Sequence, residues 1–324
     1  TCSMRWARPG KLRRPFCRVS VATPSASAQA AAQRVDRAEH HDFVITNFRT
    51  ESGVTLPTAH IVYGTYGHLN AARDNVVLLP SHYMANHHGY EWLIGPGMAL
   101  DTAKLFLVAT ELFGNGSSSS PSNTPEPLHG PRFPITTIRD NVEAVHKLLV
   151  DELHVQHLRA VIGFSMGAQQ AFQWAVSYPT FANCLVATSG TAKNYPHGMV
   201  RLEGQIAALT ADAAFQNGDY TAPPKKGLEA FGTVWTAWLF SQEWWRRELW
   251  RTYSPPGTTF EQVLKGFGTD FIPGADANYE AVFIPGVTLL PIPSLWGHTA
   301  GAASNPADAK FLNENISKFL AAHP

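Results

Sequence analysis

A serine held between two glycines separates two kinds of hydrophobic pattern in the stretch LRAVIGFSMGAQQAFQWAVSYP, residues 158–179. Residues 158–162 are aliphatic and β-branched, which is typical of a short buried strand. From residue 166 to residue 178 the apolar side chains recur with helical spacing, and Pro179 ends the pattern. Residues 163–167 therefore form a G-x-S-x-G motif in the strand–turn–helix context that gives this motif its meaning.

Steric crowding explains why both flanking positions of the motif are glycine. A strand that turns directly into a helix forces its corner residue, Ser165, into a strained backbone conformation, and small residues at positions 163 and 167 relieve the crowding. The serine hydroxyl then projects at the helix N-terminus, where N–H groups stabilise negative charge. The motif predicts that Ser165 is a nucleophile, and the alternative is a chance match of the same five letters.

Composition excludes several classes of partner. The chain has 324 residues, of which 44% are hydrophobic and 15% charged, and 25 Lys and Arg balance 25 Asp and Glu. A chain with no net charge has no overall electrostatic attraction for nucleic acid or for an anionic membrane. We therefore expect small-molecule substrates, and we expect no nucleic-acid or membrane partner. No apolar run approaches the ~18 residues that a membrane span needs. The oligomeric state, a homodimer included, stays open.

The N-terminal segment and the cysteines bear on localisation. The first 35 residues contain seven Lys or Arg and no acid, and they are rich in alanine and serine. This composition fits a mitochondrial transit segment, and equally an unstructured extension without a role. Cys2, Cys17 and Cys184 are too scattered for a disulfide framework or a zinc site, which favours a reducing compartment. We therefore expect a cytoplasmic or mitochondrial protein.

Strand and helix patterns alternate along the chain, which predicts an α/β fold with a mostly parallel sheet covered by helices on both faces. Strands are expected within residues 41–48, 57–67, 75–84, 104–112, 158–162, 181–190 and 286–298, and helices within 89–101, 137–153, 166–178 and 307–323. Residues 113–134 read as a long loop.

The predicted domain organisation has four parts. Residues 1–40 are a tail, 41–190 the first part of the core, 191–278 a helical cap, and 279–324 the last strand and the C-terminal helix. Five tryptophans crowd into sixteen positions of the cap: Trp235, Trp238, Trp244, Trp245 and Trp250. Most are expected to pack within the cap, which must also turn one aromatic face toward whatever lies beneath it.

A serine nucleophile needs a base and two N–H donors for the oxyanion. Of fourteen histidines, His298 stands out because it follows a predicted strand near the C-terminus and is flanked by glycine. An ordinary surface histidine is the alternative. The donors are expected to be the backbone N–H of Met166 and that of Tyr83 or Met84.

The adjacent residues His87 and His88 raise the alternative of a metal site. Neighbouring histidines point in different directions, and this pair lacks carboxylate partners at ligand spacing. We therefore expect no metal.

The third member of a serine triad is a carboxylate between the serine and the histidine in the chain. Asp270, twenty-eight residues before His298, is the best candidate, and Asp276 on the same predicted loop is the fallback. A missing acid is the alternative, because the cap looks short just after this point.

Five stretches together resemble the homoserine O-acetyltransferase branch of the α/β-hydrolase superfamily. They are AHIVYGTYGHLNAARDNVVLLPSHY, LIGPGMALDTAKLFLVATELFGNGSSSSPSN, GPRFPITTIRDNVEAVHKLL, GFSMGAQQAFQWA and IPSLWGH. The resemblance implies an α/β-hydrolase fold with an inserted helical cap and acyl transfer through a covalent acyl-serine. It assigns Ser165 as the nucleophile and His298 as the base, and the TDFIP context of Asp270 resembles the family's acid loop. It implies no bound cofactor, with acyl-CoA as a co-substrate.

The motif GFSMGA has fewer glycines around the serine than homoserine acetyltransferases usually have, so the chain resembles a divergent relative of the kind found in fungi. Three hypotheses follow. The first is an O-acyltransferase that moves an acyl group from acyl-CoA to a small hydroxyl acceptor. The second is a serine hydrolase or esterase of the same fold. The third is a non-catalytic relative with an incomplete triad.

Overall fold

A computed structural model describes residues 38–83, 85–193, 196–269 and 292–323. Its strands are β1 (Glu39–Arg49), β2 (Thr55–Tyr66), β3 (Val76–Pro80), β4 (Phe106–Thr110), β5 (Leu158–Phe164) and β6 (Ala182–Thr188). They form one six-stranded sheet in the order β1-β2-β4-β3-β5-β6. The strands β4, β3, β5 and β6 are parallel, and the hairpin β1–β2 joins them antiparallel through the β2–β4 pair. The predicted mostly parallel sheet is confirmed.

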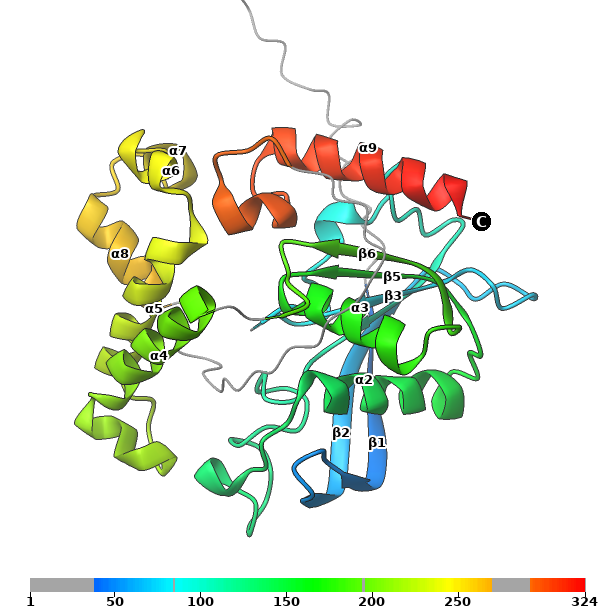
Figure 1. Cartoon of the computed structure of the whole chain (residues 1–324), viewed down its shortest axis with the longest axis horizontal. Coiled ribbons are helices and arrows are strands. Elements are labelled where there is room, and N and C mark those ends of the chain that lie inside the picture. Colours follow the sequence, from blue (N-terminus) through cyan, green and yellow to red (C-terminus); the bar gives the residue numbers. More distant parts are fainter. Residues whose placement is uncertain (1–37, 84, 194–195, 270–291, 324) are drawn as a thin grey trace, which may run out of the picture. The chain divides into compact units, whose positions relative to one another are not determined.

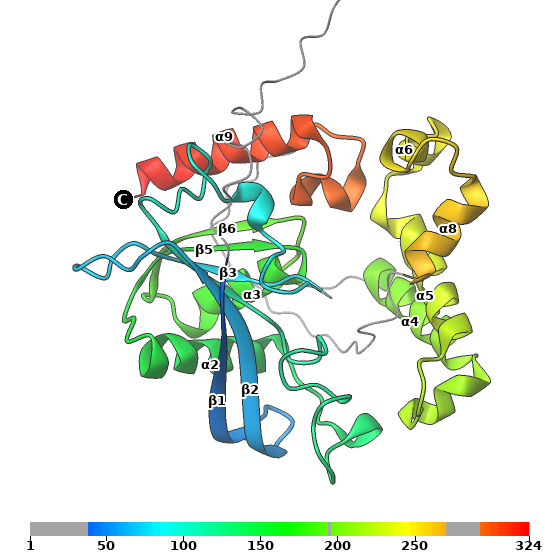
Figure 2. The same cartoon turned by 180° about the vertical axis from the view of Figure 1, so that it is seen from behind.

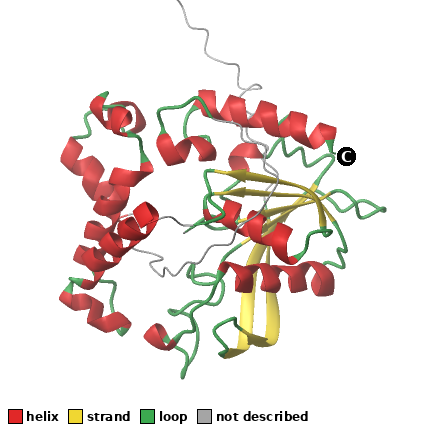
Figure 3. Ribbon diagram, viewed as in Figure 1, coloured by secondary structure: helices red, strands yellow, loops and turns green. Residues whose placement is uncertain are grey.

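Helices cover both faces of the sheet, because successive strand residues point to opposite sides. In β3, Val76 and Leu78 belong to a core under α2 (Ile138–Lys147) and α3 (Met166–Ser177). The intervening Val77 and Leu79 belong to a second core, which α9 (Pro306–Ala322) closes from the other side. Figures 1 and 3 show this layering, with α2 and α3 on one side of the strands and α9 on the other.

The helix expected over residues 89–101 is wrong. Only the 3₁₀ turn η1 (Glu91–Leu93) forms there. Pro96 follows it, and Gly97 takes a positive φ of 73°, so the chain cannot continue as a helix. Ile94 instead pairs with Leu100 in an isolated bridge, and both side chains are buried in the second core. The apolar residues that suggested a helix are buried by a compact loop.

In the chain, a group of helices follows β6 and precedes the C-terminal region, and Figures 1 and 2 draw it to one side of the sheet. It consists of α4 (Pro196–Thr210), the turn η4 (Ala213–Gly218), α5 (Lys225–Leu239), α6 (Gln242–Arg246), α7 (Trp250–Tyr253) and α8 (Phe260–Thr269). Helix α5 packs against both α4 and α8. Phe240, Trp244, Trp250 and Val263 form a small core of their own here. No helix in the described ranges is long and apolar enough to cross a bilayer.

The strand predicted over residues 286–298 is only partly covered by the structure. Residues 286–291 lie outside the described ranges, and residues 292–296 are not in a strand. The chain then forms the 3₁₀ turn η5 (Gly297–Ala302), which carries His298.

Candidate active site

Ser165 stands at the sharp corner between β5 and α3. Its backbone has φ 55° and ψ −118°, a strained conformation of the kind that proteins retain at functional positions. A Cβ on Gly163 would lie 2.0 Å from the carbonyl oxygen of Gly167, and a Cβ on Gly167 would lie 2.2 Å from that of Pro80. Side chains at either position would therefore collide with backbone, which is the steric reason predicted for the motif.

The buried side chain of Tyr90 fastens this corner to the neighbouring strand. Its hydroxyl donates to the carbonyl oxygen of Pro80 at 2.6 Å and accepts from the backbone N–H of Phe164 at 2.9 Å. Burial raises the pKa of Tyr90, so the hydroxyl keeps its proton. The ends of β3 and β5 are thereby joined one residue before Ser165. Nothing in the sequence distinguished Tyr90 from a packing tyrosine.

His298 reaches Ser165 from the far end of the chain. Its Nε2 lies 2.8 Å from Ser165 Oγ, a hydrogen bond in which the hydroxyl donates when Nε2 carries no proton. The ring packs between Phe164, at 5.0 Å between centroids, and Trp238, at 4.5 Å. Burial, together with the nearby charges of Arg201 and His82, lowers the pKa of His298 to about 4. The imidazole is therefore neutral at pH 7 and able to accept a proton.

The triad acid stays a prediction. Asp270 and Asp276 both lie outside the described residues. Within the described ranges, no carboxylate forms a hydrogen bond with His298. The described contacts thus show the serine–histidine pair. The partner of His298 Nδ1 remains the one predicted from the sequence.

Two of the three residues predicted to supply the oxyanion donors, Met166 and Tyr83, line the cavity that contains Ser165. Met166 is the first residue of α3, where backbone N–H groups have no acceptor within the helix. Tyr83 follows β3 and lines the same cavity as Ser165 and Met166. Met84 lies outside the described residues.

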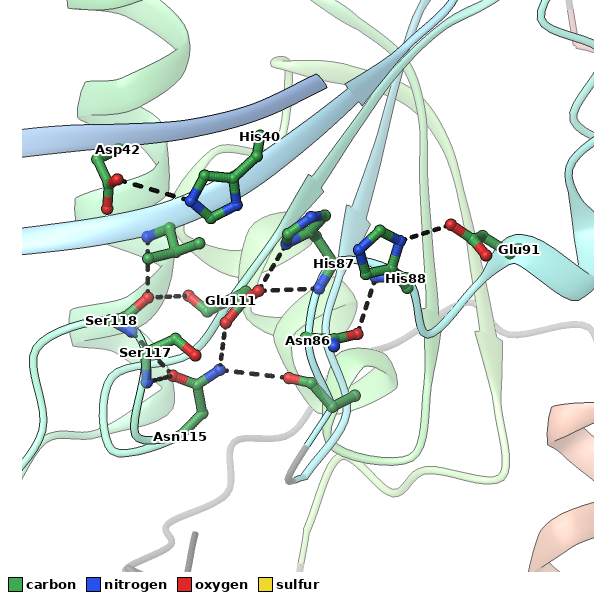
Figure 4. A network of polar contacts seen from close by, with 12 residues as sticks. His40, Asp42, Asn86, His87, His88, Glu91, Glu111, Asn115, Ser117 and Ser118 are labelled. Carbon is green, nitrogen blue, oxygen red and sulfur yellow. Dashed lines mark hydrogen bonds and ion pairs between the residues drawn. The ribbon is translucent and has the colours of Figure 1, made fainter. Parts of the chain in front are cut away.

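A buried carboxylate, Glu111, holds the loop that follows β3 (Figure 4). Glu111, directly after β4, accepts at Oε1 from both the backbone N–H of His87, at 3.1 Å, and its ring Nδ1, at 2.6 Å. Its Oε2 accepts from Asn115 Nδ2 at 2.7 Å, and the same amide also donates to the carbonyl oxygen of Ala85. Both side chains of the Glu111–His87 pair are almost fully buried. The loop is therefore anchored to the sheet at two points just beyond Tyr83.

The two adjacent histidines face different carboxylates. His87 contacts Glu111, whereas His88 Nδ1 lies 2.6 Å from Glu91 at the protein surface. No group of three or more His, Cys, Asp or Glu side chains in the described part of the chain is arranged to hold a metal ion. Glu111 lies 24 positions from His87, so spacing alone did not reveal it, whereas Glu91 lies only three positions after His88, contrary to the expectation that the pair lacks a carboxylate at short spacing.

Two cavities open beside the serine. The first, the nucleophile pocket, measures about 230 Å³ and is lined by Ser165, His298, Arg201 and Trp238 among others. Here the Arg201 guanidinium stacks over the Trp238 ring at 4.2 Å and donates to Gln205. The second, the large groove, measures about 750 Å³ and runs between residues 112–141 and the helices from α4 to α5.

The chain resembles known proteins both in sequence and in structure. A family model described as the alpha/beta hydrolase fold matches residues 75–225. The ethyl acetate hydrolase of Pseudomonas veronii is 39% identical over 60% of this chain, a match that spans only 57% of that relative's length. The homoserine O-acetyltransferase of Geobacter sulfurreducens is 30% identical over 72% of this chain and 70% of its own. The solved structure of the acetyl esterase MekB superposes with a TM-score of 0.80 at 27% identity, over 87% of this chain and 97% of that one.

Proposed function

Because the chain belongs to the α/β hydrolase fold family, in the branch that contains homoserine O-acetyltransferases and acetyl esterases, we propose that it cleaves esters through an acyl-serine formed on Ser165. The observation that carries the proposal is the 2.8 Å contact between His298 Nε2 and Ser165 Oγ at the strained corner. A neutral imidazole within hydrogen-bond reach of a serine hydroxyl is the arrangement that activates the hydroxyl as a nucleophile. The relatives named above are enzymes. Because the chain belongs to the same superfamily, this supports the prediction that it is an enzyme too.

The steps follow from the positions of these groups. Ser165 Oγ attacks the ester carbonyl carbon while its proton passes to His298 Nε2. The carbonyl oxygen becomes negative and is stabilised by backbone N–H groups, which we assign to Met166 and Tyr83. When the C–O bond breaks, His298 gives its proton to the leaving alcohol. Water then attacks the acyl-serine by the same route, which releases the acid and restores Ser165.

The charge of the cavities favours a neutral ester over an acyl-CoA as the donor. Arg201 is the single Lys or Arg among the described residues that line either cavity. The undescribed stretch 270–291 has no Lys or Arg in its sequence. Coenzyme A carries several phosphate charges, which proteins usually hold with clusters of cations or backbone N–H groups. The relative named ethyl acetate hydrolase also favours a neutral ester as the donor.

A second candidate is acyl transfer to a hydroxyl acceptor, which the relative named homoserine O-acetyltransferase favours. The chemistry up to the acyl-serine is the same. The outcome depends on whether water or an alcohol reaches the acyl-serine first, and therefore on how well the cap excludes water.

The test compares two donors. p-Nitrophenyl acetate and acetyl-CoA are each incubated with the protein, with and without small alcohols, and release of nitrophenol or of free CoA is followed. We expect nitrophenol release by the wild type but not by Ser165→Ala, and little CoA release under any condition. CoA release that depends on an added alcohol would support the transferase instead. No Ser165-dependent release from either donor would overturn the proposal and favour the non-catalytic alternative.

A further inference from the structure

The nucleophile pocket and the large groove meet at the reacting centre. Tyr83, Met166 and Phe231 line both cavities. Tyr83 and Met166 are the residues assigned to the oxyanion, so the substrate carbonyl must lie at this junction. The two substituents of that carbonyl then have two different spaces to occupy, one of about 230 Å³ and one of about 750 Å³.

The position of the general acid decides which substituent occupies which space. His298 protonates the oxygen of the leaving alcohol, so this oxygen must lie within hydrogen-bond reach of its ring. His298 lines the nucleophile pocket and is absent from the described lining of the large groove. The alcohol side of the ester therefore lies in the nucleophile pocket, and the acyl chain leaves the junction on the oxyanion side.

From this placement we propose that the large groove is the acyl-chain site of this protein and that it takes neutral, apolar acyl groups longer than acetyl. The inference rests on the proposed function and adds the identity of the substrate. The apolar wall comes from both sides of the groove, with Leu112 and Phe133 on one side and Ile206, Leu209 and Phe215 on the other.

The described lining of the groove favours neutral groups over charged ones. Among its described lining residues there is no Asp, Glu, Lys or Arg. Its volume lies in the range of pockets that bury most of a small ligand, whereas the nucleophile pocket has room only for a short alcohol. We therefore expect chain-length selectivity in the acyl part of the ester and a limit on the size of the alcohol part.

The experiment uses two ester series with matched carbon numbers. One series is ethyl esters from acetate to octanoate, and the other is acetates from ethyl to octyl. We expect kcat/KM to rise about two- to fourfold per methylene over the first carbons of the acyl series. In the alcohol series it is expected to stay flat or fall. Ethyl acetate as the best substrate of the acyl series, or a rise confined to the alcohol series, would overturn the proposal while the proposed function stands. No hydrolysis of any ester would remove both.

A pair of variants on one helix ties the selectivity to the groove. Ile206 lines the groove, whereas Val200, six residues earlier in α4, is more exposed and lines neither cavity. Ile206→Arg brings a cation to the acyl chain, so the ratio of kcat/KM for octanoate to that for acetate is expected to fall about tenfold or more. Val200→Arg carries the same change outside both cavities and is expected to keep the ratio of the wild type. An unchanged ratio in a folded Ile206→Arg variant would contradict the assignment.

Discussion

Ser165 Oγ and His298 Nε2 lie 2.8 Å apart although 133 positions separate them in the chain. The corner between β5 and α3 presents the serine, and the turn η5, which follows helices α4 to α8 in the chain, presents the histidine. Two segments that are far apart in the sequence thus meet through one hydrogen bond. The bond gives the site its chemistry, since neither residue alone makes an activated nucleophile.

The pH dependence of catalysis tests the acid predicted at Asp270. Burial, with smaller contributions from Arg201 and His82, lowers the pKa of His298 to about 4 where no described carboxylate contacts the ring. A carboxylate at Nδ1 favours the imidazolium and raises this pKa. We therefore expect the acid limb of kcat/KM to lie well above pH 4 in the wild type. In Asp270→Asn it should move down toward 4, with kcat lower by roughly 10³–10⁴. Identical limbs and rates in the two proteins would remove Asp270 from the triad.

The corner geometry makes a steric prediction at Gly167. A Cβ there would lie 2.2 Å from the Pro80 carbonyl oxygen and 2.5 Å from the Tyr90 hydroxyl. Gly167→Ala is expected to lower the free energy of unfolding by about 1–3 kcal/mol and to reduce activity strongly. Gly204→Ala in α4 is the control, since a Cβ at this position would lie near only Val234 of α5, at 3.9 Å. It should instead raise stability by roughly 0.5–1 kcal/mol. Urea unfolding measures both, and equal effects would contradict the crowding argument.

The network around Glu111 predicts an effect on turnover. In Glu111→Gln one carboxylate oxygen becomes an NH₂ group that faces a donor, either His87 or Asn115. The loop with Tyr83 is then displaced, and kcat is expected to fall about tenfold or more with little change in KM, because oxyanion stabilisation acts on the transition state.

Glu91→Gln is the matched control for that variant. Glu91 bonds to His88 and Tyr66 at the outer end of the same network and is partly exposed. Its kcat should stay within about twofold of the wild type. Equal kcat values for the two variants, with both proteins folded, would show that the Glu111 contact is structural only.

The sequence predicted much of the sheet because the strands follow local patterns, and it pointed to His298 as the partner of Ser165 because the chain order of a serine triad puts the histidine after a late strand. The run 158–162 and the helical spacing after Ser165 are intrinsic to the chain, and G-x-S-x-G ties them together. The helix expected over 89–101 failed because its apolar residues are buried by a loop that Pro96 and Gly97 shape, and composition alone does not separate these outcomes.

The supporting side chains were beyond prediction for a different reason. The contact between Glu111 and His87 joins residues 24 positions apart and depends on the spacing of β4 and the loop after β3. The position of Arg201 over Trp238 depends on how α4 packs against α5. Both relationships exist only in three dimensions, and no periodicity in the chain encodes them.

Burial of His82 predicts acid sensitivity of the fold. Burial lowers the pKa of His82 to about 4, whereas an unfolded histidine has a pKa near 6.5. Between these values the unfolded state binds a proton that the folded state excludes. The contribution to stability is therefore complete above pH 6.5 and is lost as the pH falls through 4, by up to about 3 kcal/mol. Between pH 7 and 4.5, His82→Gln should lose less unfolding free energy than the wild type in urea. Equal losses would contradict the burial argument.

The most direct test of the account is covalent labelling with a fluorophosphonate, read by intact mass and by mapping of the modified peptide. The account predicts that the wild type gains one label, on Ser165, that Ser165→Ala gains none, and that His298→Ala is labelled slower by orders of magnitude. A label on another residue, or a His298→Ala variant labelled at the rate of the wild type, would contradict it.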